Sequence, residues 1–512
     1  MEKDGRGEYL KAAAQMLNVG EDALRIVKML SKSLDAGDQE QFYYTISLVV
    51  STTDSFINTD NHPAYTEQPV PERTLHNNGE RPVVIGFGPA GMFAALELLA
   101  YGLKPIIFER GKKIEERHID VRRFMKEKVL DPESNIQFGE GGAGSYSYGK
   151  LFSRRINTKY INKVLDTFIK FGAPEEIGYI NKPHLGTDML CGIVRNIRNH
   201  ILEHGGEIHY GAKMTDILLA DHTIAGVVIN GEKEYPCSSI YLAVGHSARD
   251  TFALLNSKGI ALEQRPISVG VRVEHPVQII NHMRYGDKYK DFPGIGAATY
   301  SLNYTDRKIR RGVYTFCMCP GGEVMNASSE AGLLVVNGMS YSGRSSAFSN
   351  AAIVVTCKTE DYGSAGPLAG VAFQKDIERK AFHAGGGTWE LPAQNLLDFM
   401  GRKTSGSLNS NSCATGTTAA DMREIFPSFI TDALMTAFTA WKEDYPSFVS
   451  SHAILLGAET RSSAPFRIIR SEKYESVNVR NLYPIGEGSG YTGGITSSAA
   501  DAIRAVESAL SS

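Results

Sequence analysis

The sequence has few cysteines and lacks a long run of uncharged apolar residues. Six cysteines in 512 residues are too sparse for a disulfide framework and are typical of a protein kept in a reducing cytosol. The N-terminal stretch MEKDGRGEYLKAAAQ has acidic residues and no apolar core, so it does not read as a secretory signal. The apolar helix expected after residue 88 is interrupted by Glu97 and is too short to span a bilayer. We therefore expect a cytoplasmic protein without stable membrane association.

An excess of one charge is also missing. The chain has 54 Lys and Arg against 57 Asp and Glu, a net charge of -3, and no long run of one sign. Binding to nucleic acid through a basic face is therefore not expected. The composition, 42% hydrophobic and 22% charged, is that of an ordinary globular protein. The length predicts two or three domains and leaves the oligomeric state open.

The first part of the chain reads as a small α/β module. Residues 8–34 carry apolar residues at helical spacing, and residues 42–51, FYYTISLVVS, are rich in aromatic and β-branched types, as strands are. A polar stretch with four prolines then runs to residue 82. We expect a module and its linker over residues 1–78.

A second pattern begins at residue 83, where strand, glycine-rich turn, helix and strand follow one another, which is a βαβ unit of a parallel sheet. Between residues 266 and 454 lie strand-like runs such as ISVGVRVEH and AAIVVTC and helices such as PSFITDALMTAFTAWKED. A strand, a glycine turn and a closing helix come last. The sequence predicts an α/β fold in which a doubly wound, Rossmann-like nucleotide domain (79–265 and 455–512) is interrupted by an inserted β-rich substrate domain (266–454).

The stretch GFGPAG fits the G-x-G-x-x-G fingerprint of dinucleotide binding. Gly86 permits the tight turn, Gly88 lets a pyrophosphate approach the backbone, and Gly91 lets helix and strand pack closely. Pro89 and Ala90 stand at the start of the helix, where free N–H groups and the helix dipole favour an anion. We expect all five residues to contact the cofactor.

Glu109 ends the next strand, 23 residues after Gly86. An acid at this place can bind both hydroxyls of an adenosine ribose and would repel a 2′-phosphate, which leaves FAD and NAD open. The ending IIFERG, with Arg110 after the acid, resembles flavoprotein monooxygenases and dehydrogenases of the p-hydroxybenzoate-hydroxylase-like branch more than NAD dehydrogenases. Both Glu109 and Arg110 are expected at the cofactor.

A second resemblance lies in NLYPIGEGSGYTGGITSSAADAIRAVE, which is similar to the C-terminal flavin motif of such proteins. It implies that Glu487 takes the role of the usual Asp at the ribityl or pyrophosphate end. The residues implied at the flavin are Gly486, Glu487, Gly493, Gly494, Ile495 and Thr496. SSIYLAVG likewise resembles the segment that returns the chain under the cofactor, with Val244 in place of the usual Thr before Gly245.

These motifs, together with FGEGGAGSYSYGKL, KPHLGTDML, FCMCPGGEVMNASSE and ETRSSAPFRIIR, identify the chain as a member of a family of uncharacterised bacterial FAD-dependent dehydrogenases. The resemblance covers nearly the whole chain and implies the fold and bound FAD. From the flavin we expect hydride transfer between N5 and a small-molecule substrate. With one Rossmann fingerprint in a strand context, NAD(P)H is expected only as a transient electron donor. Two alternatives stay open: a monooxygenase that uses NAD(P)H and oxygen, and a non-enzymatic flavin-binding or regulatory protein.

The loop FGEGGAGSYSYGKL, residues 138–151, has five glycines and four hydroxyl side chains. Such a loop brings backbone N–H groups close to a phosphate or a flavin edge, and the alternative is a plain surface loop. The cofactor contacts expected here are Gly141, Gly142, Ala143, Gly144 and Lys150.

Three residues are candidates for catalysis. Lys182 and His184 lie just before a helix, for which Thr187 or Asp188 could be the N-cap, and an imidazole can act as acid or base near neutral pH. Arg461 can hold an anionic substrate bidentately, or it can form an internal salt bridge with Glu459.

The segment CMCPGG places Cys317 and Cys319 two residues apart on an expected strand. On a regular strand the two side chains share a face at a Cα separation of about 7 Å, which is too far for an unstrained disulfide. The other cysteines are isolated, so no metal site is expected. An approach of either thiol to the flavin stays open.

Overall fold

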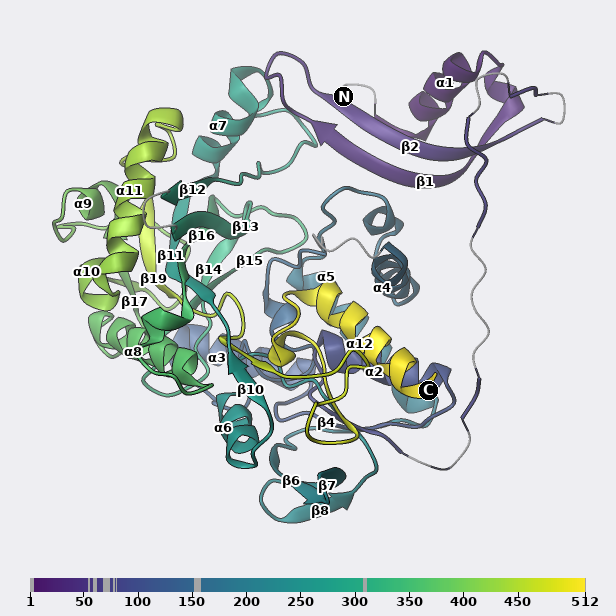
Figure 1. The fold of residues 1–512 in the computed structure, drawn as a ribbon. Coiled ribbons are helices and arrows are strands. Elements are labelled where there is room, and N and C mark those ends of the chain that lie inside the picture. Colours follow the sequence, from purple (N-terminus) through teal and green to yellow (C-terminus); the bar gives the residue numbers. More distant parts are fainter. Residues whose placement is uncertain are drawn as a thin grey trace.

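The computed structural model describes residues 4–53, 56–58, 62–67, 74–76, 79, 81–151, 158–306 and 311–511. Figure 1 shows three parts: an N-terminal module that extends from one corner, a parallel-sheet domain with the C-terminal helix, and a domain built on a large antiparallel sheet. The α/β fold with a Rossmann-like sheet and an inserted β-rich domain is thereby confirmed.

The N-terminal module contains α1 (Arg6–Leu17), a short 3-10 turn (Glu21–Ala23), and the antiparallel hairpin of β1 (Leu24–Asp35) and β2 (Tyr43–Thr52). The helical interpretation of residues 24–34 is wrong, because this segment is β1. Two register shifts, at Ile26/Lys28 and at Met29/Ser31, interrupt the two-residue period of the strand. Its apolar residues therefore stand at a spacing that resembles a helix.

The module is held by its hairpin loop and by the middle of β1. Phe42 is 3% exposed and stacks on Tyr289 with ring centroids 4.2 Å apart. The Lys32 N–H donates to the Tyr179 carbonyl at 2.7 Å, and the Asn181 N–H donates back to Lys32 at 2.9 Å. The hairpin therefore bridges the other two domains.

The first domain is built on a five-stranded parallel sheet in the order β21-β9-β3-β4-β5. Its strands are β3 (Val83–Ile85), β4 (Ile106–Phe108), β5 (Glu207–His209), β9 (Ile240–Leu242) and β21 (Leu482–Pro484). Its helices are α2 (Pro89–Ala100), α3 (Ile114–Glu127), α4 (Thr158–Lys170), α5 (Thr187–Glu203), α6 (Arg249–Ser257) and α12 (Ile495–Leu510). A three-stranded antiparallel sheet is formed by β6 (Met214–Ala220), β7 (Thr223–Ile229) and β8 (Lys233–Pro236). Strand β21 and helix α12 complete this domain from far along the chain.

The inserted domain has a seven-stranded sheet in the order β12-β13-β16-β11-β19-β17-β18. Its strands are β11 (Ile267–Pro276), β12 (Asn303–Asp306), β13 (Arg311–Cys319), β16 (Phe348–Cys357), β17 (Leu391–Asn395), β18 (Thr417–Ala419) and β19 (Ile454–Glu459). Beside it lie the pair β14 (Glu323–Asn326) and β15 (Val336–Met339) and the helices α7 (Val277–Tyr289), α8 (Ala369–Ala384), α9 (Leu396–Met400), α10 (Met422–Ile425) and α11 (Ser428–Asp444). Because β19 belongs to this sheet, the sheet extends past the expected boundary at residue 454 as far as Glu459.

Both connections between the two domains run side by side. Strand β10 (Leu262–Gln264) precedes β11, β20 (Phe466–Ile468) follows β19, and the two pair in antiparallel fashion. The inserted domain therefore joins the nucleotide domain through a two-stranded ribbon.

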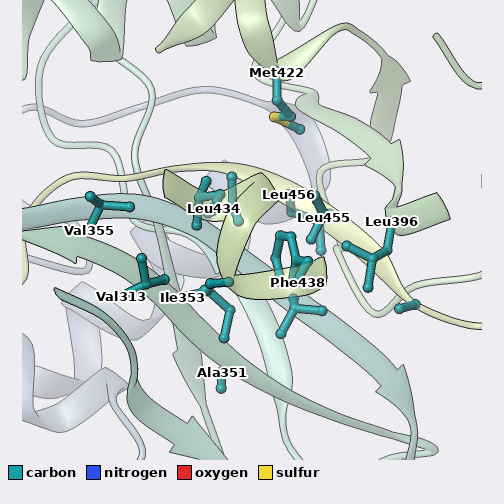
Figure 2. Close-up of a cluster of buried hydrophobic side chains, with 14 of the residues drawn as sticks. Val313, Ala351, Ile353, Val355, Leu396, Met422, Leu434, Phe438, Leu455 and Leu456 are labelled. Carbon is teal, nitrogen blue, oxygen red and sulfur yellow. The ribbon is translucent and has the colours of Figure 1, made fainter. Parts of the chain in front are cut away.

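The core of the inserted domain lies between the sheet and α11. Figure 2 shows Leu434 and Phe438 of α11 against Ile353, Val355 and Leu455 of the strands, and all five are fully buried. Full burial of one such side chain stabilises the fold by about 1.5 to 3 kcal/mol. On β11 the core residues Val269, Val271 and Val273 alternate with residues that include Arg272 and Glu274, so the face of β11 that points away from α11 carries charged side chains.

Among the described residues, none of the helices combines the length and the apolar character needed to cross a lipid bilayer.

Candidate functional site

The turn between β3 and α2 contains three glycines. Close packing against neighbouring backbone requires glycine at residues 86 and 91, but it does not require glycine at residue 88. A Cβ on Gly86, which has φ +96°, would lie 2.6 Å from the Ala243 carbonyl oxygen, and one on Gly91 would lie 1.9 Å from the Gly86 carbonyl oxygen. A Cβ on Gly88 would meet only the backbone of Gly142, with the Cα at 3.5 Å and the N at 3.9 Å, which are ordinary contacts. The protein itself therefore has room for a side chain at residue 88, and the missing Cβ leaves the start of α2 open.

Glu109 ties three loops together beside this turn. Its side chain is 4% exposed and accepts the N–H groups of Phe87 at 2.7 Å, Gly111 at 2.9 Å and Gly139 at 3.0 Å. A carboxylate has roughly four acceptor positions, so these three described donors leave one for a ribose hydroxyl. The contact of Glu109 with both ribose hydroxyls stays a prediction.

The glycine-rich loop is organised by Arg117, which sequence reasoning missed. This side chain is fully buried on α3. Its guanidinium donates to the backbone carbonyls of residues 135, 136, 139, 140 and 142, at distances between 2.7 and 3.3 Å. The sequence offers little indication of this role, because the partners of Arg117 are backbone carbonyls and the other residues of α3 form an ordinary charged, amphipathic helix. Arg117 thus fixes the conformation of a loop that contains two predicted contacts, Gly141 and Gly142.

Arg110 is held by acids. Its Nη1 and Nη2 lie 3.0 Å from the two carboxylate oxygens of Asp250, and its Nε lies 2.6 Å from Glu133. The guanidinium also lies 4.0 Å from the Phe138 ring centroid. These contacts join β4 to α6, and the expected cofactor contact of Arg110 stays a prediction.

The turn after β21 packs against the starts of α2 and of the turn after β9. A Cβ on Gly486 would lie 2.6 Å from the Ala90 Cβ, and one on Gly488 would lie 2.6 Å from the Gly245 carbonyl oxygen. Since β21, β9 and β3 are parallel neighbours, the turns at their carboxyl ends meet at one edge of the sheet, where open α/β sheets bind ligands.

The start of α12 closes this edge. A Cβ on Gly144 would lie 3.1 Å from Ile495 Cγ1, and the Thr496 hydroxyl donates to the Leu151 carbonyl at 2.9 Å. The N-termini of α2 and α12 therefore flank the glycine-rich loop. The predicted residues that lie at this edge are Gly86, Gly88, Pro89, Ala90, Gly91, Glu109, Gly141, Gly142, Ala143, Gly144, Val244, Gly245, Gly486, Glu487, Gly493, Gly494, Ile495 and Thr496.

His246 and Glu487 form a pair at this edge. The His246 Nε2 lies 4.0 Å from Glu487 Oε1, and Glu487 Oε2 accepts the Gly494 N–H at 3.4 Å. Burial raises the pKa of Glu487 to about 7. Burial and the nearby Arg461 and Arg249 lower the pKa of His246 to about 3, so its ring is neutral. Sequence reasoning did not select His246, although it directly follows the glycine after β9.

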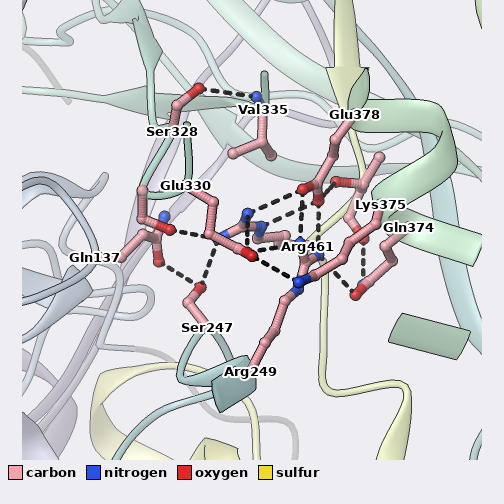
Figure 3. A network of polar contacts seen from close by, with 12 residues as sticks. Gln137, Ser247, Arg249, Ser328, Glu330, Val335, Gln374, Lys375, Glu378 and Arg461 are labelled. Carbon is pink, nitrogen blue, oxygen red and sulfur yellow. Dashed lines mark hydrogen bonds and ion pairs between the residues drawn. The ribbon is translucent and has the colours of Figure 1, made fainter. Parts of the chain in front are cut away.

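Arg461 lies in a buried network that joins the two domains (Figure 3). It donates to Glu378 at 2.9 Å, to Ser329 at 2.8 Å and to Ser247 at 3.1 Å. Glu459, the partner considered from the sequence, pairs instead with Arg272 at 2.9 Å. The guanidinium of Arg461 is thus engaged by protein groups, and its contact with an anionic substrate stays a prediction.

His184 and Tyr148 meet Arg344 of the inserted domain. The His184 ring stacks on Tyr148 with centroids 4.8 Å apart, and the Tyr148 hydroxyl accepts from Arg344 Nη2 at 2.8 Å. Burial, followed by the charge of Arg344, lowers the pKa of His184 to about 4. His184 also forms a backbone bridge with Lys150, whereas Lys182 is exposed. The catalytic roles of His184 and Lys182 stay predictions.

The helix that follows His184 is not capped by a side chain. Its N-cap residue is Gly186, whose neighbours Thr187 and Asp188 are the first residues of α5. Asp188 instead accepts the Ser342 N–H at 2.9 Å. The N-cap interpretation of Thr187 and Asp188 is therefore wrong, because the carboxylate is used to join α5 to the inserted domain.

The edge of the parallel sheet fits a dinucleotide. Two helix N-termini offer N–H groups without intrahelical partners, Gly88 leaves the first of them open, and Glu109 keeps an acceptor position. An FAD would be held by these groups.

The chain is similar to several known proteins. Residues 266–462 match a family described as "FAD-dependent protein, C-terminal domain-like". An uncharacterised protein of Clostridium beijerinckii is 44% identical over 429 residues, which cover 83% of this chain and 80% of that protein. The FAD-dependent monooxygenase nodY2 of Hypoxylon pulicicidum is 27% identical over 203 residues, 37% of this chain and 43% of the monooxygenase.

Solved structures with a similar chain include two FAD complexes. CtdE in complex with FAD has 12% identity and a TM-score of 0.30, and the match covers 84% of each chain. A mutant of the halogenase PltM in complex with FAD has 11% identity and a TM-score of 0.40, with 84% of this chain and 68% of the halogenase covered. The expectation of FAD as the cofactor is confirmed by the family match.

Proposed function

The chain belongs to the same protein family as its Clostridium beijerinckii relative, and from this premise we propose that it is an FAD-dependent oxidoreductase that acts on a small molecule in the cytoplasm. The observation that carries the proposal is the meeting of two helix N-termini, Glu109 and the glycine-rich loop at one edge of the sheet, next to the polar face of the inserted domain. When bound, the flavin supplies hydride exchange with the substrate.

The chain's own residues have distinct tasks in this proposal. Glu109 and Arg117 fix the loops that receive the cofactor, so that little reorganisation accompanies binding. Glu487, with a pKa of about 7, holds or releases a proton at Oε1 close to neutral pH. The adjacent His246 ring stays neutral over this range because its pKa is lowered to about 3. The substrate lies between this pair and the sheet face that carries Arg272, and NAD(P)H is the proposed transient donor.

The direct test is to purify the protein, release the ligand with acid and identify it as FAD by chromatography and mass. Gly88→Val should bring a side chain to the start of α2 and remove the FAD. Gly406→Val is the matched control, because a Cβ there meets nothing within 4 Å. Full FAD retention by Gly88→Val would show that the cofactor does not use this turn.

A monooxygenase is the second candidate, favoured by the similarity to nodY2. The two reactions differ in their use of oxygen. Oxidation of NAD(P)H with stoichiometric oxygen uptake that depends on a metabolite would support the monooxygenase, and anaerobic turnover would support the dehydrogenase. A holoprotein that binds metabolites from an extract but turns over none of them would support a binding or regulatory role.

A further inference from the structure

Cys317 and Cys319 do not stand at the separation expected for a regular strand. The register between β13 and β16 shifts between Phe316 and Cys319, and Cys317 has φ +44°. This irregularity folds the Cys319 thiol back onto residue 317, where it donates to the Cys317 carbonyl at 3.4 Å. The argument from a spacing of about 7 Å therefore does not apply, because it assumed unbroken strand geometry.

Arg272 lies behind the two sulfurs. It is fully buried, on the face of β11 opposite the core valines. Its Nη1 donates to the Cys317 carbonyl at 3.2 Å and lies 3.7 Å from Cys319 Sγ. Glu459, at 2.9 Å, balances its charge. A guanidinium at this place stabilises a thiolate.

The two thiols differ in access and in proton affinity. Cys317 is partly exposed, whereas Cys319 is fully buried. Contact with Cys319 and the charge of Arg272 lower the pKa of Cys317 to about 6, whereas burial raises the pKa of Cys319. The other titratable groups whose charges act on this pair are Glu459, Tyr300, Tyr148 and Glu487. Tyr148 and Glu487 belong to the nucleotide domain, so the thiols lie near that domain.

The remaining cysteines, all in the described part of the chain, lack this environment. Burial raises the pKa of Cys237 to about 11 and that of Cys357 to about 12. It also raises the pKa of Cys191 and of Cys413. Cys413 is partly exposed like Cys317 and is therefore a suitable internal reference.

We propose that Cys317 and Cys319 form a thiol–disulfide exchange site, in which the partly exposed Cys317 attacks a disulfide substrate and the buried Cys319 resolves the product. The thiolate of Cys317 forms a bond to one sulfur of the substrate, the substrate S–S bond breaks, and one thiol leaves. The sulfur of Cys319 then attacks that of Cys317, and the second thiol leaves. The protein is oxidised by two electrons to an internal disulfide, and the substrate disulfide is reduced to two thiols, which take the Cys319 proton and one from solvent.

This exchange is independent of the proposed flavin reaction. A disulfide across a single intervening residue is strained, and strained disulfides are readily reduced again. The site therefore suits reversible exchange with small or exposed disulfides and not a permanent crosslink.

The test uses the purified full-length holoprotein with oxidised glutathione as the probe. After reduction and desalting, the protein is incubated with the probe, quenched with acid, alkylated and mapped by mass spectrometry. We expect a disulfide within the 317–319 peptide and two molecules of glutathione released per chain. Cys319→Ser should instead trap glutathione on Cys317, and Cys413→Ser should behave as wild type.

A second test measures the rate of thiol alkylation in the wild-type protein, so it does not depend on the folding of any variant. In the wild-type protein at pH 7, iodoacetamide should modify Cys317 about tenfold faster than Cys413, because more of Cys317 is thiolate. Equal rates, or a folded Cys319→Ser protein without a mixed disulfide, would overturn the proposal. Loss of FAD from Gly88→Val leaves this test unaffected, so the two proposals fail separately.

Discussion

Arg249 of the nucleotide domain and Glu378 of the inserted domain form a buried bidentate ion pair, with both nitrogen–oxygen distances at 2.8 Å. Arg461 approaches the same carboxylate from the other side at 2.9 Å, and the Thr460 hydroxyl donates to it at 2.6 Å. The proximity of two guanidinium groups holds the pKa of Glu378 well below its usual range. Glu330 pairs with the same two guanidinium groups at 2.9 and 3.4 Å, so two carboxylates of the inserted domain together balance the two cations.

Glu378→Gln should destabilise the protein strongly, because two buried guanidinium groups lose their fully buried charge partner and keep only the partly exposed Glu330. We expect a loss of about 3 to 5 kcal/mol in the free energy of unfolding, measured by denaturant titration. Asp376→Asn on the same helix is the control. It removes an exposed pair with Lys380 and should change stability by less than about 0.5 kcal/mol. A loss below about 1 kcal/mol for Glu378→Gln would contradict the role given to this carboxylate.

Gly91→Ala should lower the stability of the apoprotein, whereas Gly88→Ala should leave that stability unchanged and weaken FAD binding. The new Cβ at residue 91 would lie 1.9 Å from a backbone oxygen, so this variant should unfold at a lower temperature even without FAD. At residue 88 the protein has room, so the apoprotein should melt normally and bind FAD more weakly. Thermal melts of the apoproteins and FAD titrations separate the two effects. A normal melt for Gly91→Ala would show that α2 can move away from β3.

Arg117→Met should loosen the glycine-rich loop without touching a side chain of the cofactor site. Hydrogen bonds to a charged donor contribute about 1.5 to 3 kcal/mol each, and five carbonyls lose theirs. We expect a stability loss of at least about 3 kcal/mol and at least tenfold weaker FAD binding. Arg117→Lys should not restore either, because an ammonium cannot reach five acceptors in a plane. Arg123→Met, which breaks an exposed pair with Glu127, is the control, and wild-type FAD affinity in Arg117→Met would contradict the proposed task.

The stability of the protein should depend on pH through Glu274. Burial raises the pKa of this carboxyl to about 7 from an ordinary value of 4.5, so the folded state binds more protons than the unfolded state between these values. Stability should therefore fall as pH rises from 4.5 to 7, by at most about 3 kcal/mol for this group. Glu274→Gln should remove that part of the slope, whereas the exposed Glu360→Gln should not. Parallel pH profiles for wild type and Glu274→Gln would refute the assignment.

The sequence predicted those parts of the fold that depend on local patterns. The β3–α2 turn was predictable because Gly86, Gly91 and Glu109 stand at fixed spacings, and α12 was predictable from its amphipathic run. Residues 24–35 were misread, because two bulges changed the apparent period of β1. The position of β19 in the large sheet could not be seen, because strand order depends on contacts between distant segments.

The polar contacts of the site were less accessible to sequence reasoning. Arg117 binds carbonyls 18 to 25 residues away. Because every residue has a backbone carbonyl, the sequence does not indicate which residues accept these hydrogen bonds. Arg272 and Glu459 are 187 residues apart, and only the pairing of β11 with β19 brings them together. Cys317 and Cys319 were visible as a motif, but their contact depends on an irregularity that residue types did not reveal.

The order of the elements along the chain also constrains when the protein can acquire its cofactor. The edge of the parallel sheet takes β3 and α2 from the first part of the nucleotide domain but β21 and α12 from residues beyond 480. During synthesis, β3 and α2 leave the ribosome before the whole inserted domain, and β21 and α12 follow only after it. Until then the hydrophobic faces of β9 and α2 that β21 and α12 cover are exposed to other chains and to chaperones. In the proposed site, complete FAD binding therefore requires that translation has passed α12.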